Sequence, residues 1–263
     1  MTLADRYDAL LFDLDGVLYR GDQRVVHAGS SMAALRERGA RLAFLTNNSS
    51  RTPAQVARKL VAMGIEARAE EIVTSALATA DLLAGRSGTA YVIGEDGIRQ
   101  ALAAAGIQIA DGEPDAVDHV VVGVDFAVTY AKLATACELV ERGARLVATN
   151  PDGSFPVAGA LWPGAGALLA VITTTTGAEP EVVGKPFAPL FVSAATRVEA
   201  ERPLVIGDRL DTDIAGAVLC GWDSVLVLTG VSTRDDVSTS RVRPTFVVDD
   251  LGALIADEEP PRL

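Results

Sequence analysis

The sequence predicts an α/β fold with a doubly wound parallel-sheet core, into which a second α/β domain is inserted. Apolar runs of strand length alternate with segments of helix length along the chain of 263 residues, as expected of strand-helix-strand units. Two stretches with Gly, Pro, Arg or Ser, around 84–89 and 177–180, interrupt this alternation. We therefore expect a core formed by 1–82 and 183–263 and an inserted α/β domain over 83–182.

The first core segment begins with a short apolar run before a turn. Residues 10–12 (Leu-Leu-Phe) predict a strand that is covered on both faces, and Gly16 gives the backbone the freedom for a sharp exit. A second apolar strand over 41–45 ends in Thr46-Asn47-Asn48-Ser49-Ser50. The other elements expected before the insertion are helices over 29–38, 54–63 and 75–83 and a strand over 72–74.

The insertion and the second core segment continue the alternation. In the insertion we expect strands over 91–93, 120–124 and 145–148 and helices over 97–105, 130–141 and 168–176. Residues 151–166 are rich in Gly and Pro and predict a long ordered loop, and loops of that length in compact domains usually serve function. The core resumes with strands over 181–183, 204–206, 224–228 and 245–248 and helices over 189–200 and 213–219.

The composition disfavours several classes of function. Lys and Arg total 23 against 35 Asp and Glu, so the net charge of -12 disfavours nucleic acid and anionic membranes as partners. Cys137 and Cys220 stand far apart in apolar contexts, and His27 and His119 lack ligand spacing, so neither a disulfide nor a zinc site is expected. The chain has no signal-peptide pattern and no apolar run of about 18 residues. The sequence therefore predicts a cytoplasmic protein.

Carboxylates follow two of the expected core strands. Asp13 and Asp15 end the first strand on the same side of it, and Gly207-Asp208-Arg209-Leu210-Asp211-Thr212-Asp213 follows the strand over 204–206. Because the carboxyl ends of parallel strands meet at one edge of a sheet, we expect these acids to lie close together. Crowded carboxylates repel unless a cation separates them, and their oxygens suit a hard cation such as Mg²⁺. The sequence therefore predicts a Mg²⁺ site, although Asp13-Leu14-Asp15-Gly16 alone fits an ordinary polar turn equally well.

Thr46 and Lys185 also follow expected strands, so we expect them at the same edge as Asp13 and Asp208. A phosphate ester there would meet a cation, an ammonium, a hydroxyl and backbone N–H groups, which suit the charge on transferring phosphoryl oxygens. Asp13 can then attack phosphorus, while Asp15 gives a proton to the leaving oxygen and later takes one from water. The pattern therefore indicates phosphoryl transfer from a phosphate ester.

Four motifs in this order resemble the signatures of the haloacid dehalogenase (HAD) superfamily of phosphohydrolases over nearly the whole chain. They are Asp13-Leu14-Asp15-Gly16, Thr46-Asn47, Gly184-Lys185-Pro186, and Gly207-Asp208 with Asp213. The resemblance implies a Rossmann-like core and an aspartyl-phosphate intermediate, with Asp13 as the nucleophile and Asp15 as the general acid and base. The implied phosphate-binding residues are Thr46, Asn47 and Lys185. The implied Mg²⁺ ligands are Asp13, Asp208 and the backbone carbonyl of Asp15, with Asp213 in a supporting role.

Further motifs resemble the NagD-like phosphatases of the para-nitrophenylphosphatase type, whose large cap is inserted between the second and third signatures. They are Thr46-Asn47-Asn48-Ser49-Ser50, Gly94-Glu95-Asp96-Gly97, Val122-Gly123-Val124-Asp125, Thr149-Asn150-Pro151-Asp152 and Pro163-Gly164-Ala165-Gly166. The resemblance implies a small phosphorylated metabolite as substrate, of the glycerol 3-phosphate, phosphoglycolate, sugar phosphate, nucleotide or pyridoxal phosphate class. A homodimer through the cap is a reasonable expectation. The substrate-facing loop would be 150–166, with Asn150, Asp152 and Trp162 as candidate contacts and packing within the cap as the alternative for Trp162.

Three other functions fit part of the pattern. A receiver-type regulatory module also gathers acids, a Thr and a Lys at strand ends, and a metabolite-binding module would need no turnover. A phosphomutase would return the phosphoryl group from Asp13 to its substrate. The chain length, the insertion and the second acid, Asp15, favour a phosphatase, because Asp15 provides a base for dephosphorylation.

A short repeat raises a question about the phosphate-binding motif. Thr149-Asn150 follows Glu141-Arg142-Gly143-Ala144-Arg145-Leu146, just as Thr46-Asn47 follows Glu37-Arg38-Gly39-Ala40-Arg41-Leu42. Chain order assigns the phosphate to Thr46, which follows the strand next along the chain after that of Asp13, whereas Thr149 lies in the insertion. Asn48 has no assigned role, and Asp211 is expected to be an exposed acid at a helix start.

Overall fold

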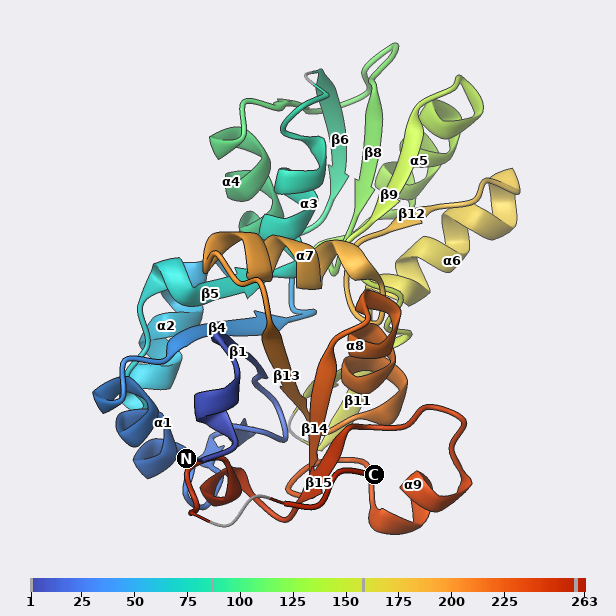
Figure 1. Ribbon diagram of the computed structural model, residues 1–263. Coiled ribbons are helices and arrows are strands. Elements are labelled where there is room, and N and C mark those ends of the chain that lie inside the picture. Colours follow the sequence, from blue (N-terminus) through green and yellow to red (C-terminus); the bar gives the residue numbers. More distant parts are fainter. Residues whose placement is uncertain (1, 87, 158, 258–259) are drawn as a thin grey trace. The chain divides into compact units, whose positions relative to one another are not determined.

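The structure is a computed structural model that describes residues 2–86, 88–157, 159–257 and 260–263 (Figure 1). The chain forms two compact units, each with a sheet covered by helices, which confirms the predicted α/β class. The first unit comprises Met1–Thr46, Pro53–Val73 and Lys185–Leu263, and the second comprises Asn47–Thr52 and Thr74–Gly184. These units are defined by packing, and the domain ranges 1–82, 83–182 and 183–263 stay a prediction.

The first unit, called the core below, contains a six-stranded sheet in the order β15-β14-β13-β1-β4-β5. The strands are β1 (Ala9–Asp13), β4 (Arg41–Thr46), β5 (Ile72–Thr74), β13 (Pro203–Gly207), β14 (Asp223–Val227) and β15 (Phe246–Val248). The pairs β1 with β13, β1 with β4, β13 with β14 and β14 with β15 are parallel. The sheet grows outward from β1 in both directions, so the strand order reverses between β1 and β13. Open α/β sheets bind ligands at the carboxyl edge of such a switch point.

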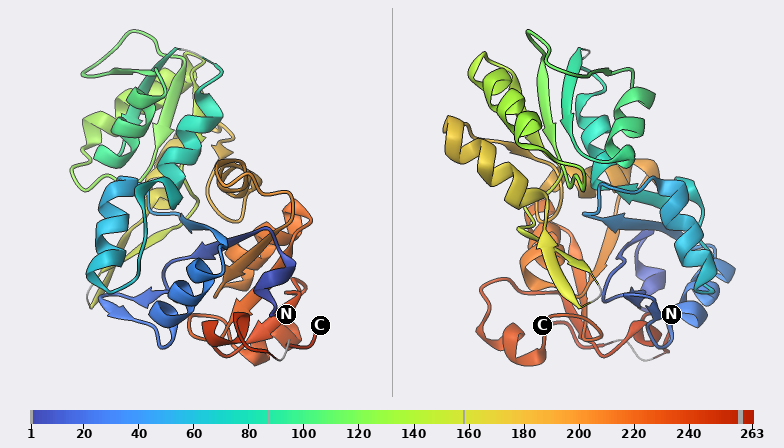
Figure 2. Two further views of the ribbon diagram at one scale, coloured as in Figure 1. Left: turned by 60° about the vertical axis from the view of Figure 1, so that its left-hand side comes forward. Right: turned by 180° about the vertical axis from the view of Figure 1, so that it is seen from behind.

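Helices cover both faces of the core sheet (Figure 2). They are α1 (Ala28–Glu37), α2 (Pro53–Ala62), α7 (Ala188–Arg197), α8 (Ala215–Cys220) and α9 (Arg234–Thr239), with 3₁₀ turns at Ala4–Arg6, Ala69–Glu71 and Leu251–Leu254. Leu10 and Phe12 pack in the apolar cluster that contains α1 and α2, whereas Leu11 is buried on the opposite face of β1. Because both faces are covered, the run Leu-Leu-Phe needs no polar alternation.

The second unit, called the cap below, contains a five-stranded parallel sheet in the order β12-β9-β8-β6-β7. The strands are β6 (Thr89–Ile93), β7 (Gln108–Ala110), β8 (His119–Val122), β9 (Arg145–Ala148) and β12 (Glu181–Val182). The helices are α3 (Ser75–Leu83), α4 (Asp96–Ala104), α5 (Tyr130–Glu141) and α6 (Ala165–Thr176). Ile93, Val120 and Val122 form an apolar cluster of the cap with buried residues of α5 and α6.

Two cap elements differ from the sequence expectation. Residues 151–166, expected as a loop, contain an antiparallel hairpin of β10 (Ser154–Val157) and β11 (Ala160–Pro163), with Phe155 opposite Trp162. The Pro and Gly residues of this segment hide its strand pattern, because both residue types are depleted in strands. β7 was not expected either, because Gln108-Ile109-Ala110 contains no buried apolar run.

The core also contains elements that the sequence did not predict. The helix expected over 213–219 is a π-helical turn, Leu210–Ile214, followed by α8. The small hairpin of β2 (Tyr19–Arg20) and β3 (Gln23–Arg24) and the helix α9 were not expected.

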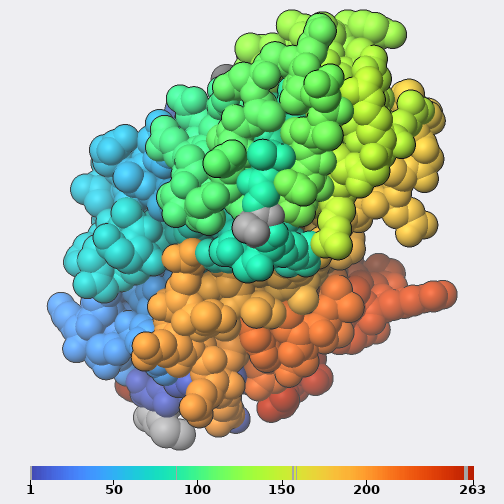
Figure 3. All heavy atoms as spheres, turned by 90° about the horizontal axis from the view of Figure 1, so that it is seen from above, coloured from blue at the N-terminus to red at the C-terminus, as the bar shows by residue number. Residues whose placement is uncertain are grey.

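Among the described residues, no helix combines the length and the apolar character that a membrane crossing requires. Residues of the cap form the green surface in the space-filling view (Figure 3).

Candidate active site

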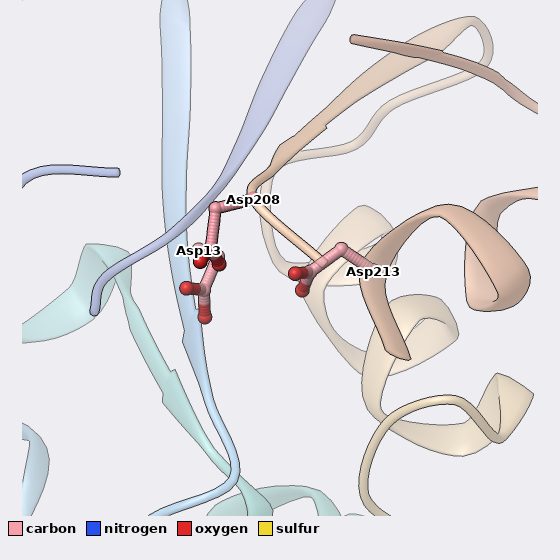
Figure 4. A group of neighbouring side chains, drawn as sticks. All are labelled: Asp13, Asp208 and Asp213. Atoms are coloured by element: carbon pink, nitrogen blue, oxygen red, sulfur yellow. The ribbon is translucent and has the colours of Figure 1, made fainter. Parts of the chain in front are cut away.

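Three carboxylates meet at the carboxyl edge of the core sheet (Figure 4). Asp13 is the last residue of β1, Asp208 directly follows β13, and Asp213 lies in the π turn after β13. One oxygen of each carboxylate lies within 4.8 Å of an oxygen of each of the other two. Because β1 and β13 are neighbouring parallel strands, Asp13 and Asp208 leave the sheet side by side. The structure thus brings together Asp13, Asp208 and Asp213.

The π turn returns Asp213 toward the end of β13. An ideal Cβ on Gly207 would lie 2.1 Å from the Cβ of Asp213, so only a glycine leaves room for this approach. The backbone N–H of Arg209 donates to Oδ2 of Asp213 at 3.2 Å. The motif Gly207-Asp208 with Asp213 therefore has a steric reason, because the glycine lets the second acid fold back beside the first.

The ammonium of Lys185 lies among these acids and is almost fully buried. Its Nζ donates to Oδ1 of Asp213 at 2.7 Å and also to Oδ1 of Asp13. Burial alone would lower the pKa of Lys185, but the Asp13 and Asp213 carboxylates outweigh it and raise this pKa above its ordinary value. Lys185 therefore stays charged and balances one of the three carboxylates.

Lys185 reaches the site by a different route from the one expected. We expected it directly after a strand of the core sheet, but β12 pairs with β9 and belongs to the cap sheet. The chain re-enters the core at Lys185. β12 has two residues, of which Glu181 is exposed, so it lacks the buried apolar run of the core strands. A sequence pattern does not tell which of two parallel sheets such a short strand joins.

Burial and mutual repulsion raise the pKa values of the acids. The pKa of Asp13 is raised well above its ordinary value by burial and by the Asp213 and Asp208 carboxylates, and Lys185 opposes this shift. Burial and the Asp213 carboxylate raise the pKa of Asp208 to about 6. A group of carboxylate oxygens with excess negative charge suits a hard divalent cation. The donor set therefore fits Mg²⁺.

Two glycines allow the chain to approach Asp208 closely. An ideal Cβ would lie 1.8 Å from Oδ2 of Asp208 if placed on Gly230, and 2.3 Å from it if placed on Gly16, whose φ is +82°. The backbone N–H of Val231 donates to the same oxygen at 2.7 Å. The sequence analysis did not identify Gly230 and Val231 as site residues. Their position after the predicted strand 224–228 could have indicated them, because it places them at the carboxyl edge of the sheet.

Thr46 and Asp15 lie next to the strand end that carries Asp13, Thr46 on the paired strand β4 and Asp15 two residues further along the chain. Thr46 is buried at the end of β4, the neighbour of β1. Asp15 is exposed, and its Oδ2 accepts a hydrogen bond from the Tyr19 hydroxyl at 3.2 Å. The backbone N–H of Gly16 donates to the carbonyl oxygen of Tyr19 at 2.7 Å. Tyr19 thus orients Asp15, a role that its apolar sequence context did not signal.

Asn47 contacts two of the candidate substrate residues within the cap. Its side-chain Nδ2 donates to Oδ2 of Asp152 at 3.1 Å, and its carbonyl oxygen accepts from Nδ2 of Asn150 at 2.7 Å. Asn150 in turn accepts a hydrogen bond from the backbone N–H of Asp152 at 3.0 Å. The structure therefore brings Asn47, Asn150 and Asp152 together, and packing places Asn47 with the cap although it directly follows β4.

Trp162 belongs to an aromatic cluster of the cap hairpin. Its ring centroid lies 6.0 Å from that of Phe126, which lies 5.4 Å from that of Phe155, and both pairs meet edge to face. Trp162 and Phe126 are each 51% exposed. The cluster thus combines packing within the cap with an open aromatic surface.

Asn48 and Asp211, which the sequence left without a role, both have local partners. Oδ1 of Asn48 accepts from the backbone N–H of Ser50 at 2.9 Å, as in an Asx turn. Asp211 forms an ion pair with Arg209 at 2.7 Å and is exposed. Hydrogen bonding to Arg209 lowers the pKa of Asp211 below its ordinary value. Neither residue belongs to the group of three acids.

Comparison with known proteins shows the family to which the chain belongs. A model of the haloacid dehalogenase-like hydrolase family matches residues 10–108, and a HAD-hydrolase-like model matches residues 182–254. An acid sugar phosphatase of Staphylococcus aureus is 42% identical over 258 residues, which cover 97% of this chain and 99% of that protein. The chain belongs to the haloacid dehalogenase-like hydrolases. The resemblance seen in the four sequence motifs is therefore confirmed.

Solved structures of this family resemble the chain over nearly its whole length. The glycerol phosphate phosphatase of Mycobacterium tuberculosis in complex with magnesium has a TM-score of 0.92 and 37% identity, over 97% of this chain and 78% of that chain. NagD of Escherichia coli has a TM-score of 0.87 and 33% identity, over 95% of this chain and 98% of that chain. The chain is thus a NagD-like member of the haloacid dehalogenase-like hydrolases.

Proposed function

We propose that the protein is a Mg²⁺-dependent phosphatase that hydrolyses the phosphomonoester of a small metabolite. The observation that carries this proposal is the contact of Lys185 with Asp13 at the carboxyl edge of the sheet, beside Asp208 and Asp213. A carboxylate nucleophile, a buried ammonium and a cation site are the parts that phosphoryl transfer requires. The relatives are named for sugar phosphate and glycerol phosphate hydrolysis, so we propose a substrate of this size and charge.

The carboxylates of Asp13 and Asp208 would hold Mg²⁺, together with the backbone carbonyl of Asp15. The cation would supply positive charge for the phosphoryl oxygens and offset the repulsion among the acids. Asp213 supports this group through its hydrogen bond with Lys185. Lys185 in turn keeps a positive charge next to Asp13, where phosphoryl oxygens would gather during transfer.

The chain's own residues account for both halves of the hydrolysis. A carboxylate oxygen of Asp13 forms a bond to phosphorus as the bond from phosphorus to the leaving oxygen breaks, and protonated Asp15 gives its proton to that oxygen. Asp15 then takes a proton from water, whose oxygen attacks phosphorus and releases phosphate and the Asp13 carboxylate. Thr46 and Lys185 hold the phosphoryl oxygens through both steps. Tyr19 orients Asp15 by its hydrogen bond.

Release of phosphate from para-nitrophenyl phosphate in the presence of Mg²⁺ tests this proposal. We expect multiple turnovers from the wild-type protein and no release above background from Asp13→Asn, because the amide lacks the nucleophilic charge. Asp211→Asn is the matched control, since it removes an exposed acid that belongs to the π turn of Asp213 but lies outside the group of three. Unchanged release by Asp13→Asn would contradict the assignment, and a single turnover by the wild type would favour a regulatory phosphoryl acceptor.

Three further features of the proposal rest on the family resemblance. The cap segment 150–166 would select the substrate, and a cap-to-cap homodimer would be the assembly. A cytoplasmic site of action would give the enzyme access to phosphorylated metabolites. The net charge of -12 argues against nucleic acid as a partner.

A further inference from the structure

Asn47, which follows Thr46, is held by hydrogen bonds with the repeated Thr149-Asn150 motif of the cap and with Asp152. Nδ2 of Asn150 donates to the carbonyl oxygen of Asn47 at 2.7 Å, and Asp152 accepts from Nδ2 of Asn47 at 3.1 Å. The hydrogen bond from the backbone N–H of Asp152 to Oδ1 of Asn150 ties these two cap residues to each other. Both the main chain and the side chain of Asn47 are therefore held, one peptide bond away from Thr46.

The residues after Asn47 are embedded in the cap as well. Ser49 is fully buried, and its hydroxyl accepts a hydrogen bond from Oγ1 of Thr149 at 3.2 Å. The backbone N–H of Gly97 donates to the carbonyl oxygen of Ser50 at 3.3 Å. An ideal Cβ on Gly97 would lie 2.4 Å from the carbonyl oxygen of Ser49, so α4 begins in direct contact with this segment. The segment 47–52 thus has its positions set by cap residues.

The same cap residues pack against the segment that leads to Lys185. An ideal Cβ on Gly184 would lie 2.5 Å from the carbonyl oxygen of Thr149, 2.6 Å from Oδ1 of Asn47 and 2.8 Å from Cβ of Asn150. Gly184 therefore has no room for a side chain. It lies against Asn47, and one peptide bond separates it from Lys185. The two chain segments that continue into Thr46 and Lys185 are thus packed against each other at Thr149 and Asn150.

We propose that Thr149, Asn150 and Asp152, called the junction clamp below, are positioning residues for the phosphate-binding groups Thr46 and Lys185. The inference rests on the proposed function, because it takes the Thr46 hydroxyl and the Lys185 ammonium as the groups that hold the phosphoryl oxygens. Asn47 and Gly184 are the clamped residues, and each is bonded to one of these groups. A displacement at the clamp therefore displaces a phosphate-binding group.

The junction clamp acts on the part that all substrates share. Thr46 and Lys185 would contact the phosphoryl group, so loss of the clamp lowers kcat/KM by a similar factor for every phosphomonoester. It also weakens the binding of inorganic phosphate, which has no leaving group. A residue that contacts the rest of the substrate behaves differently, because its loss changes the order of preferred substrates and leaves phosphate inhibition unchanged. This distinguishes positioning by Asn150 and Asp152 from the substrate contacts expected from the resemblance.

Kinetics of Asn150→Ala, Asp152→Ala and Asp152→Asn test the clamp. For Asn150→Ala we expect kcat/KM to fall between about tenfold and a hundredfold, the range for misplaced catalytic groups. The fall should be alike for para-nitrophenyl phosphate, glycerol 3-phosphate and a hexose phosphate, with a raised inhibition constant for inorganic phosphate. Asp152→Ala should do the same, whereas Asp152→Asn keeps an acceptor oxygen for Asn47 and should retain most of the activity.

Two controls separate positioning from a general loss of stability. Thr129→Ala removes the N-cap hydrogen bond of α5 in the same unit, so we expect a lower Tm with unchanged kinetics. Gly184→Ala would collide with the clamp, whereas Gly85→Ala enters open space and should be silent. If Gly184→Ala fails to fold, Asn150→Ala still decides, because it introduces no collision.

Three outcomes overturn the inference. Unchanged rates and phosphate inhibition in Asn150→Ala would show that the clamp positions nothing. Losses that differ among substrates with unchanged phosphate inhibition would make Asn150 a substrate contact. In both of these cases an active wild-type protein leaves the proposed function standing. If the wild-type protein releases no phosphate from any of the substrates, the proposed function fails and the clamp inference fails with it.

Discussion

At the scale of single residues, the carboxylates of the active site carry more negative charge than their surroundings balance. Lys185 neutralises one of three, and the pKa of Asp208 is raised from 3.8 to about 6 by burial and by Asp213. The raised pKa means that Asp208 holds its proton more tightly in the folded, metal-free protein than in the unfolded chain. Ionisation of Asp208 therefore opposes folding when no cation is bound.

This has a measurable consequence for stability against pH. Between about pH 4 and pH 6 the folded state binds more protons than the unfolded state, so the stability of the metal-free protein falls as the pH rises. Asp13, whose pKa is also raised, contributes with the same sign. Mg²⁺ competes with the proton, so we expect it to raise Tm more at about pH 7.5 than at about pH 5.

Thermal unfolding with EDTA or Mg²⁺ at the two pH values measures this effect. Asp208→Asn should lose most of the Mg²⁺-dependent rise in Tm, because it replaces a charged ligand with a neutral amide. Asp211→Asn should behave as the wild type, since Asp211 lies outside the group of three acids. An equal rise at both pH values in the wild type would mean that these carboxylates do not bind the cation.

Several site residues were visible in the sequence because a local rule places them. Asp13, Thr46 and Asp208 end or follow apolar strands, and parallel strands bring such residues to one edge of the sheet. Gly230 and Tyr19 were missed for different reasons. Gly230 also follows a core strand, but its role is to let the backbone approach Asp208 closely. A close approach of this kind is seen only in the folded structure. Tyr19 is buried and reads as a core residue, although its hydroxyl bonds to Asp15.

At the scale of secondary-structure elements, the hairpin of β10 and β11 presents an exposed aromatic side chain, Trp162. Trp162 and Phe126 expose about half of their surface and meet edge to face. Exposed aromatic rings contact the apolar face of a sugar or an aromatic group favourably. We therefore expect Trp162→Ala to lower kcat/KM for para-nitrophenyl phosphate and hexose phosphates about twofold to tenfold more than for glycerol 3-phosphate.

A panel of phosphomonoesters at fixed Mg²⁺ measures these ratios. Leu161→Ala is the matched control, because Leu161 is exposed on the neighbouring position of β11 and so points to the other side of the hairpin. Phosphate inhibition should stay unchanged in both variants. If Trp162→Ala leaves the ratios among substrates as they are, the aromatic cluster serves only the packing of the cap.

Elements were predictable where one periodicity runs long enough. The strands near 10–12 and 41–45 and the helices near 29–38 and 130–141 form close to the expected positions, because buried strands and amphipathic helices each leave a sustained pattern. β12 has two residues, too few to show which sheet it joins, and β7 lacks the buried apolar run of the predicted strands. The π turn before α8 depends on the contact between Gly207 and Asp213, which a helical pattern does not contain.

At the scale of the whole molecule, the sequence predicts two α/β units but not which unit each connecting segment packs with. The segment 47–52 follows a core strand and packs with the cap, since Ser49 is buried there beside Thr149. Packing of this kind joins residues about a hundred positions apart and leaves no local signal. The same packing joins the repeated Thr149-Asn150 motif to Asn47 and Ser49, so this motif is a candidate clamp rather than a second phosphate site.

The net charge of the whole molecule, -12, affects how fast an anionic substrate approaches the site. With Mg²⁺ bound, the three carboxylates, the Lys185 ammonium and the cation balance, so the long-range field on an approaching substrate comes from the remaining surface and is negative. A phosphomonoester is an anion and is repelled. Added salt screens this repulsion, with a Debye length of about 10 Å at 0.1 M, so we expect kcat/KM to rise roughly twofold to tenfold as NaCl increases at fixed Mg²⁺.

Steady-state kinetics on para-nitrophenyl phosphate over a series of NaCl concentrations checks the sign. The internal control is kcat, which should change little because the bound substrate lies within groups whose charges balance, and buried charges are screened less than exposed ones. A fall of kcat/KM with salt would mean that a positive local field at the site dominates the approach. The active site would then attract its substrate against the negative charge of the molecule as a whole.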